Sequence, residues 1–325
     1  MAVTSLVGAS VKRREDPRMI TGTGQYVDDV KLVNMAYMAV LRSPHGHARI
    51  RDIRTDAARR ALGVLAVLTG SDLKDRLGLV PVAAQLPDMK VPKHYALAVD
   101  KVRFVGEPVA AVVAESRYAA SDALSLIEVD YEPLPAVIDI EKAVQADAPV
   151  LHEELAGEKN ETGDANVAYR WSLAGGNVEQ AFADADVTVS QRMVNQRLAP
   201  VPMETRTVAA SFQRGADELT VWSSTQIPHL LKTQLALMLN LPEQRVRVIS
   251  PDVGGGFGCK LNVYAEEALA ALLAMQLGRP VNWVEQRSEG MQGTIHGRDH
   301  VAYVEAAAKR DGTITALRYR VYADL

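Results

Sequence analysis

Four glycines surround one phenylalanine in residues 254–258, which form the sequence Gly-Gly-Gly-Phe-Gly. Glycine has no Cβ atom, so such a loop lets backbone approach a ligand closely, and its successive N–H groups can bind anionic oxygens. It is not a Walker A loop, because Lys260 is followed by Leu261 where that motif needs Ser or Thr. It is also one residue shorter than the dinucleotide-binding pattern G-x-G-x-x-G. The residues alone therefore leave two interpretations open, an oxyanion-binding loop and an ordinary tight turn.

Gln226 is a second group that could carry polar chemistry, because it directly precedes a helix expected over Ile227–Leu239. Its carboxamide has both a donor and an acceptor, which could hydrogen-bond an oxo or hydroxo group. The neighbouring Ser224 and Thr225 are typical helix caps, so capping alone would also explain this polar stretch. From the residues alone, capping is the favoured interpretation.

The histidines and the single cysteine show no metal-binding pattern. The seven histidines form neither an H-E-x-x-H helix nor a Cys/His zinc spacing. His45 and His47 could share one face of a strand, but polar residues in a turn after Pro44 are the favoured interpretation. Cys259 cannot form an internal disulfide or hold an iron–sulfur cluster, which takes four cysteines, and we expect a small buried side chain there.

Length and composition indicate a globular protein of two domains. The 325 residues are 48% hydrophobic and 23% charged, close to the average of globular proteins, and the net charge of -4 predicts no general attraction to nucleic acid. No apolar run is long enough to span a membrane. Glu15 and Asp16 follow the basic residues 12–14 with no apolar segment after them, which is unlike a signal peptide. A cytoplasmic location is therefore expected.

Strands and helices must position these groups, and the first part of the chain shows signals for both. Short apolar runs between turn residues predict strands, and capping residues ahead of apolar positions predict helices. This mixture over about residues 20–140 indicates an α+β domain. The predicted strands are Met38–Leu41, Val64–Leu68, Pro108–Ala114 and Val129–Tyr131, and the predicted helices are Thr55–Leu62, capped by Thr55, and one that ends at Leu126, capped by Ser116.

The composition becomes polar and glycine-rich from about Pro149 to Gly176, which indicates an exposed connection. We therefore expect an arm over 1–20, a first domain over 21–145, a linker over 146–176 and a second domain over 177–325, with no sheet shared between the domains. The elements predicted for the second domain are a helix capped by Asn177 with Gln180, the strands Val187–Val194, Val208–Phe212, Leu219–Trp222 and Val246–Ile249, the helices Ile227–Leu239 and Ala265–Leu277, and a hairpin of Val301–Ala308 with Ile314–Tyr322.

Several short motifs together resemble one enzyme family. In their order and spacing, which cover nearly the whole chain, they are similar to the large subunits of the molybdenum hydroxylases, the family of xanthine dehydrogenase, aldehyde oxidase and aerobic carbon monoxide dehydrogenase. The motifs are Arg14–Arg18, Thr21–Asp29, Arg42–His45, His47–Ile50, Val105–Ala110, Val129–Pro135, Pro202–Glu204, Ser224–His229 and Gly254–Gly258.

The resemblance implies a fold and a cofactor site. The fold would be α+β, with an α/β hammerhead domain followed by the first part of a molybdopterin-binding domain. The molybdenum cofactor, expected in its cytosine dinucleotide form, would lie against Gln226, Gly255, Gly256, Phe257 and Gly258. The pterin dithiolene would hold the metal, so no direct protein ligand is expected.

The resemblance also implies an activity. It would be oxidative hydroxylation of an aldehyde or an N-heterocycle, or oxidation of carbon monoxide, with electrons passed to partner subunits that carry a [2Fe–2S] cluster and FAD. Purine substrates are disfavoured, because Leu261 stands where purine-oxidising members have a substrate-binding glutamate. The catalytic residues are unknown, since the family's base glutamate would lie beyond Leu325. Glu204, Glu266 and Glu267 are not assigned that role, because a structural or a solvated position explains each of them at least as well.

The end of the sequence adds a further expectation and an alternative function. Leu325 directly follows a strand pattern, so we expect a chain that is split or cut there, inactive alone and completed by the remainder of the large subunit. The alternative is a non-catalytic half-subunit or fragment that binds cofactor or assists assembly.

Overall fold

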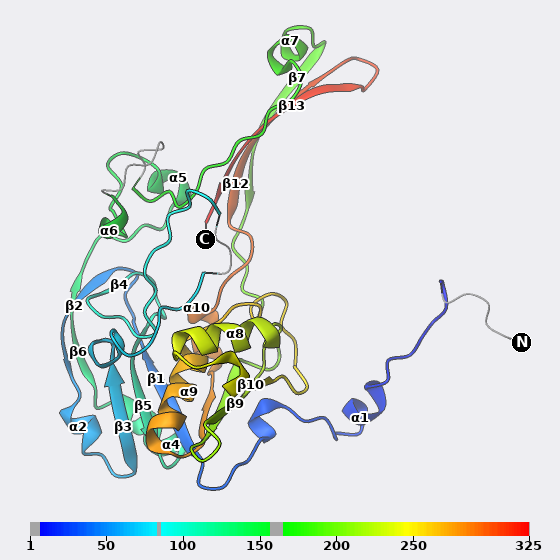
Figure 1. The fold of residues 1–325 in the computed structure, drawn as a ribbon. Helices are drawn as coiled ribbons and strands as arrows, with labels where there is room; N and C mark the ends of the chain where they lie inside the picture. The colour runs from blue at the N-terminus through cyan, green and yellow to red at the C-terminus, as the bar shows by residue number, and fades with distance from the viewer. Residues whose placement is uncertain (1–6, 83–85, 157–164, 325) are drawn as a thin grey trace, which may run out of the picture.

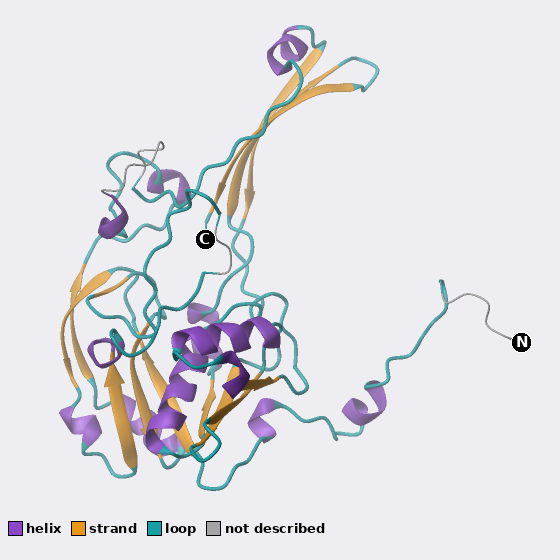
Figure 2. Ribbon diagram, viewed as in Figure 1, coloured by secondary structure: helices purple, strands orange, loops and turns teal. Residues whose placement is uncertain are grey.

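The computed structural model describes residues 7–82, 86–156 and 165–324 of the chain. Within them the chain forms one seven-stranded sheet and two three-stranded sheets. Helices and strands occur throughout the described chain (Figure 2), and the predicted α+β class is confirmed. The expectation about Leu325 concerns a residue outside the described ranges.

The seven-stranded sheet is the centre of the molecule, with the strand order β10-β9-β8-β11-β1-β5-β3. The sequence PVAAVVA gives β5 apolar side chains on both of its faces, and every residue of the strand except the first is buried. β1 lies antiparallel to it, with Met38 opposite Val113. The strands are β1 (Ala36–Arg42), β3 (Val64–Thr69), β5 (Pro108–Ala114), β8 (Thr207–Gln213), β9 (Glu218–Ser223), β10 (Val246–Ile249) and β11 (Val281–Val284).

β1 joins the two halves of the sequence in one sheet. On the side away from β5 it pairs in parallel with β11, which places Ala36 opposite Val281. The expectation that no sheet is shared between the two predicted domains is therefore wrong. The physical reason is that a change to polar composition marks where the chain is exposed, whereas strand pairing depends on apolar faces that can meet from distant parts of the sequence. The domain ranges themselves remain predictions.

Helices cover both faces of this sheet (Figure 1). α8 (Pro228–Met238) and α9 (Ala265–Leu277) pack on one face, where Met38 and Val113 belong to the largest apolar cluster. α2 (Asp56–Arg59) and α4 (Arg117–Leu124) pack on the opposite face around Val112. Successive residues of a strand point to opposite faces, so one strand, β5, contributes to both clusters. α9 ends at Gly278, whose left-handed φ of 63° is typical of a glycine that ends a helix.

A smaller sheet and several short helices complete the body. The sheet has the order β4-β2-β6, and Ala48 of β2 pairs with Val102 of β4. β2 has no counterpart among the predicted strands, because its sequence ARIRDIR is dominated by charged residues. The remaining elements are β2 (Ala48–Arg54), β4 (Lys101–Val102), β6 (Glu128–Pro133), α1 (Asp16–Ile20), η1 (Val27–Asp29), α3 (Gly70–Leu73), α5 (Ile140–Ala143), α6 (Glu153–Ala156), η2 (Glu243–Arg245) and α10 (Arg287–Gly293).

The third sheet is an arm that projects from the body (Figure 1) and consists of β7 (Val187–Asn195), β12 (His300–Ala308) and β13 (Ile314–Ala323). Cross-strand neighbours share a face, so its two faces differ. One face is polar, with the row Ser190–Glu305–Arg318, and α7 (Val178–Ala183) packs on it. The other face is apolar, with the row Val189–Ala306–Leu317, whose outer members are each 59% exposed. The arm therefore exposes an apolar sheet face.

Two predicted caps are present in the structure. The hydroxyl of Ser116 accepts a hydrogen bond from the N–H of Ala119 at 3.1 Å, as predicted for α4. Asn177 accepts from the N–H of Gln180 at 3.2 Å, but the Gln180 carboxamide donates to Asp184 and does not return to Asn177. The capping box predicted for α7 is thus only half formed.

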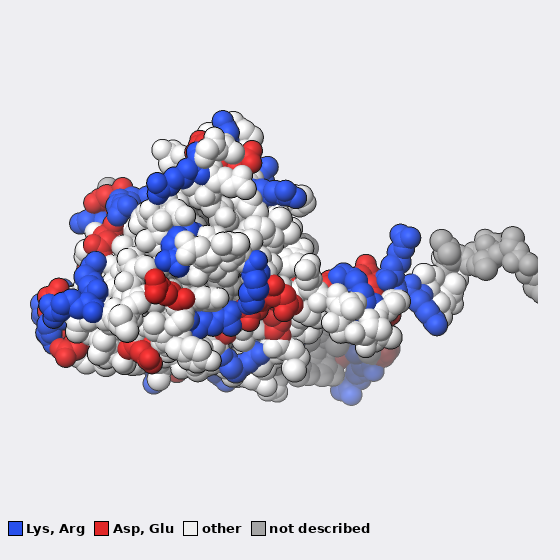
Figure 3. Space-filling view, turned by 90° about the horizontal axis from the view of Figure 1, so that it is seen from below, with Lys and Arg blue, Asp and Glu red and all other residues white. Residues whose placement is uncertain are grey.

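The surface carries charges of both signs. On the face drawn in Figure 3, basic and acidic side chains alternate over the body and do not gather into a field of one sign. Among the described residues, no helix is long and apolar enough to cross a membrane.

The buried carboxyl of Glu267 on α9 should make stability depend on pH. Burial raises its pKa to about 7 from 4.5, although it accepts hydrogen bonds from the Ser223 hydroxyl and the Tyr264 N–H. A raised folded pKa means that folding loses stability as pH rises from about 4.5 to about 7, by up to about 1.4 kcal/mol per pH unit.

Glu267→Gln imitates the protonated carboxyl and should reduce the pH slope by the part that Glu267 contributes, while Glu107, whose pKa burial also raises to about 7, should keep its own part. Urea denaturation at pH 5, 6 and 7 measures it, with Glu218→Gln, an exposed position on β9, as the control that keeps the wild-type slope. An unchanged slope in Glu267→Gln would show that the carboxyl is ionised throughout this range.

Candidate functional site

The glycine-rich loop connects β10 to α9, and its first glycine is fixed by Glu204. The N–H of Gly254 donates to Glu204 Oε2 at 2.8 Å, and the N–H of Glu204 donates to the carbonyl oxygen of Gly254 at 3.0 Å. Lys260, beyond the loop, donates from Nζ to the same Glu204 Oε2 at 2.7 Å, and its side chain is fully buried. One carboxylate thus binds both the start of the loop and the residue that follows it.

Gln226 fixes the last glycine of the loop. Its Oε1 accepts from the N–H of Gly258 at 3.1 Å, and its own N–H donates to the carbonyl oxygen of Lys260 at 2.9 Å. A Cβ atom at Gly256 would lie 2.4 Å from Gln226 Oε1, so only glycine permits this contact. The predicted proximity of Gln226 and the loop is confirmed.

Thr225 forms a local turn just before α8 and does not cap the helix. Its hydroxyl accepts from the N–H of Ile227 at 3.1 Å, at the start of α8. Ser224 is used elsewhere, because its hydroxyl accepts from the N–H of Thr207. In the described structure no side-chain hydrogen bond caps α8, so the capping interpretation of this polar stretch is wrong. Gln226 Nε2 keeps its hydrogens for another acceptor.

Three successive N–H groups of the loop remain available. Among the described residues, those of Gly255, Gly256 and Phe257 donate to no protein acceptor. The backbone turns to left-handed φ at Gly255, 96°, and at Phe257, 51°, a conformation in which adjacent N–H groups form a concave anion-binding nest. The loop therefore fits a ligand that presents anionic oxygens at close range.

A buried ion cluster lies behind the loop. Arg206, just before β8, donates to Glu285 at 2.6 and 2.9 Å and to Glu266 of α9 at 2.9 Å, and it stacks on the Tyr264 ring at 3.8 Å. Arg42 of β1 forms a second ion pair with Glu266, at 2.6 Å. Burial alone would raise the pKa of Glu266, but the two guanidinium groups outweigh it and lower that pKa to about 2. Glu266 is therefore ionised and fully paired, which leaves it no proton to exchange near neutral pH.

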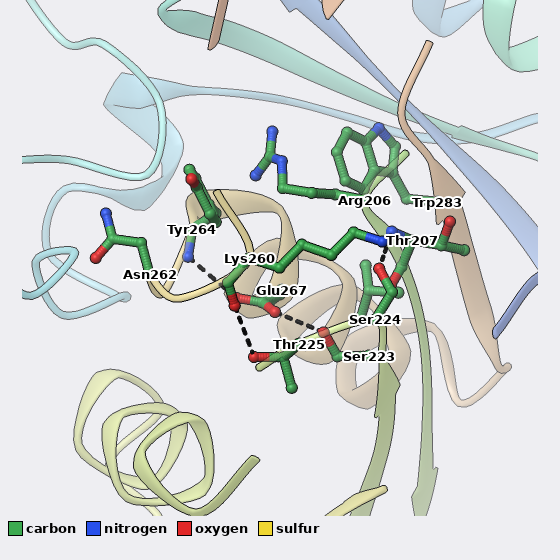
Figure 4. Close-up of a pocket in the computed structure, with 11 residues that line it drawn as sticks. Arg206, Thr207, Ser223, Ser224, Thr225, Lys260, Asn262, Tyr264, Glu267 and Trp283 are labelled. Carbon is green, nitrogen blue, oxygen red and sulfur yellow. Dashed lines mark hydrogen bonds between the residues drawn. The ribbon is translucent and has the colours of Figure 1, made fainter. Parts of the chain in front are cut away.

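Figure 4 shows the small polar cavity between this cluster and the loop. The Lys260 side chain extends along it toward Thr207, and Arg206 lies beside Trp283. Ser223 donates to Glu267 Oε1 at 2.6 Å within the same cavity. Polar groups that are buried here bind one another, so the cavity supports the loop and is not an open binding site.

Two family models match the sequence. A domain described as the aldehyde oxidase and xanthine dehydrogenase a/b hammerhead domain matches residues 21–135. The molybdopterin cofactor-binding domain matches residues 159–325, just over half of the chain. The chain belongs to the molybdenum hydroxylase large-subunit family. The resemblance predicted from the short motifs is thereby confirmed.

Individual members of this family are similar over nearly the whole chain. The carbon monoxide dehydrogenase large chain of Afipia carboxidovorans is 41% identical, over 98% of this chain and 39% of that protein. The nicotine 6-hydroxylase large subunit of Paenarthrobacter nicotinovorans is 38% identical, over 98% of this chain and 38% of that protein. Quinoline 2-oxidoreductase from Pseudomonas putida 86 has the same fold, with a TM-score of 0.90 at 39% identity, over 97% of this chain and 39% of that chain. The chain spans about two fifths of the length of these relatives.

Other residues considered in the sequence have structural explanations within this molybdenum hydroxylase chain. Cys259 is buried, as predicted. His47 contacts the carbonyl oxygen of Pro135 at 2.8 Å. Over the described ranges, no group of three or more His, Cys, Asp or Glu side chains is arranged to hold a metal ion. The contact of Glu204 with Lys260 is the feature that sequence reasoning missed, and the burial that makes this pair matter is visible only in the fold.

The Glu204–Lys260 pair should contribute strongly to stability. Glu204→Gln removes the charge that compensates a fully buried Lys260, which should cost about 3 kcal/mol. The double variant Glu204→Gln/Lys260→Met removes both charges and should recover most of that loss. Denaturant unfolding measures both variants. Glu243 is exposed and lies 3.7 Å from the partly exposed Lys232, so Glu243→Gln should cost less than about 1 kcal/mol. Equal costs for Glu204→Gln and Glu243→Gln would contradict the buried pairing.

Proposed function

We propose that this chain binds the molybdenum cofactor at the 254–258 loop and serves in a molybdenum-dependent oxidoreductase. The observation that carries the proposal is the set of three unpaired N–H groups at Gly255, Gly256 and Phe257 beside the Gln226 carboxamide. When bound, the cofactor supplies two-electron oxidation of a carbon substrate. The loop residues that carry these donors have no titratable side chains, so their role is to bind and orient the cofactor.

The chain's own residues would act by preorganisation. Gly258 and Gly254 are held at fixed points by Gln226 and Glu204, so the donors between them do not need to reorganise when an anionic oxygen arrives. Gln226 Nε2 is fixed in orientation, because the N–H of Gly258 selects which end of the carboxamide is the acceptor. We propose Gln226, Gly255, Gly256, Phe257 and Gly258 as the cofactor-binding residues.

The substrate, partners and location are inferred from the family. We propose oxidation of an aldehyde, an N-heterocycle or carbon monoxide, and not of a purine, since Leu261 is apolar and half exposed. Two relatives are named a large chain and a large subunit, which supports partner subunits for this chain, with a [2Fe–2S] cluster and FAD as the electron acceptors. The cytosine dinucleotide form of the cofactor, a cytoplasmic location and a base glutamate outside this sequence belong to the same proposal.

The domain assignment belongs to it as well. We propose a hammerhead domain over 21–145 and a cofactor domain over 177–325, joined by residues 146–176. Residues 157–164 of that connection lie outside the described ranges. The N-terminal segment predicted over 1–20 contacts the chain two residues before the glycine-rich loop, because Arg18 forms an ion pair with Asp252. This contact would let the N-terminal segment stabilise the cofactor site.

Gly256→Ala tests the cofactor assignment. The added Cβ would displace the Gln226 carboxamide and release the N–H of Gly258, so the assembled complex should lose most of its molybdenum. Metal analysis of the purified complex measures it. Gly215→Ala adds the same atom where nothing lies within 4 Å and should keep the wild-type content. Full molybdenum content in Gly256→Ala, with unfolding unchanged in both variants, would show that the loop is only a turn.

A further inference from the structure

An open cleft of about 500 Å³ adjoins the glycine-rich loop. It lies where the arm enters the body (Figure 1), because Asn195 ends β7 and His300 begins β12. Phe257 belongs to both features, as a member of the loop and as one wall of the cleft, and it is 75% exposed. A molecule in this cleft would therefore lie next to whatever the loop binds.

Backbone strain is concentrated at this cleft. Eight non-glycine residues in the described ranges have left-handed φ, and five of them are Asn or Asp, which tolerate that conformation. The other three are Val201, Phe257 and Arg298. Phe257 and Arg298 line the cleft, and Val201 directly follows Pro200, which also lines it. Strain of this kind persists where the surrounding structure holds a functional geometry.

The strained segment is held by contacts within and beside the cleft. Leu198 and Gly297 exchange two backbone hydrogen bonds of 2.9 Å, which join the two walls. Arg197 donates to the carboxylate of Asp299 at 2.8 Å, so the charge of Asp299 is neutralised away from the cleft. Arg298 lies between Gly297 and Asp299, which these contacts fix, and has a φ of 74°.

The side chains that line the cleft give it a defined chemistry. Leu198, Ala199, Pro200 and Phe257 form an apolar wall. Arg298 carries the one permanent charge in the lining, which contains no carboxylate. Among the described residues, its guanidinium has no ion-pair or hydrogen-bond partner. A flat apolar ligand with an anionic group matches this combination.

We propose that this cleft binds the substrate, that Arg298 recognises an oxyanion on it, and that the substrate is an aromatic or heteroaromatic molecule that carries a carboxylate. The guanidinium would pair with the carboxylate, and Phe257 would contact the ring. Asn195 and His300 offer further polar contacts at the far wall. That the ligand is oxidised rests on the proposed function, whereas its binding in the cleft does not.

Binding to the purified complex is measured first by calorimetry, with benzoate and its neutral counterpart benzamide as the probes. Benzoate should bind at least tenfold more tightly than benzamide. Arg298→Gln should weaken benzoate binding about tenfold and leave the affinity for benzamide unchanged. Arg247→Gln, an exposed arginine of β10 that lies outside the lining of the cleft, is the matched control. Equal affinities for the two probes, or equal effects of the two variants, would overturn the inference.

Turnover and metal content separate this inference from the proposed function. In the complex, Arg298→Gln should raise KM for 4-carboxybenzaldehyde about tenfold and leave KM for benzaldehyde unchanged. Benzoate binding that depends on Arg298, in a complex without molybdenum, would contradict the proposed function and keep the cleft assignment. Loss of molybdenum in Arg298→Gln with unchanged benzoate affinity would overturn the cleft assignment, because Arg298 would then bind a phosphate of the cofactor.

Discussion

The buried guanidinium of Arg206 is the constraint on which the site depends. It ties Glu285, after β11, to Glu266 on α9, and Glu266 in turn pairs with Arg42 of β1. A buried ion pair costs several kcal/mol of desolvation for each ion, so the arrangement survives only when every charge has its partner in place. The cluster therefore fixes α9 against the sheet. Because the glycine-rich loop leads into α9, the position of α9 determines where the loop ends.

With both ends fixed, the loop can keep donors unpaired at its centre. Glu204 holds Gly254 and Gln226 holds Gly258, while the intervening N–H groups donate to no acceptor in the described part of the chain. Unpaired backbone donors are unfavourable unless water or a ligand satisfies them, which explains why the structure surrounds this segment with so many compensating contacts. Left-handed φ at Gly255 and Phe257 is part of the same arrangement.

Local patterns were sufficient to predict most of the elements, whereas the proximity of Gln226 to the loop was predicted from the family resemblance. Pro108–Ala114 and Ala265–Leu277 coincide with β5 and α9, because apolar runs and glycine caps act within a short segment. β2 has no apolar run, and the pairing of β1 with β11 depends on a contact between distant segments. The Glu204–Lys260 pair escaped prediction for the same reason, since each residue alone is typical of a solvated surface.

The position of β1 in the central sheet has a consequence for biosynthesis. Its antiparallel neighbour β5 leaves the ribosome soon after it, but its parallel neighbour β11 starts at Val281 and is synthesised much later. Until then, the edge of β1 has no strand beside it and can pair with other chains. Folding dominated by such long-range contacts is slow, so β1 and β5 must wait, partly structured, until β11 has been synthesised. A nascent chain of this kind is a natural client for chaperones that shield strand edges during translation.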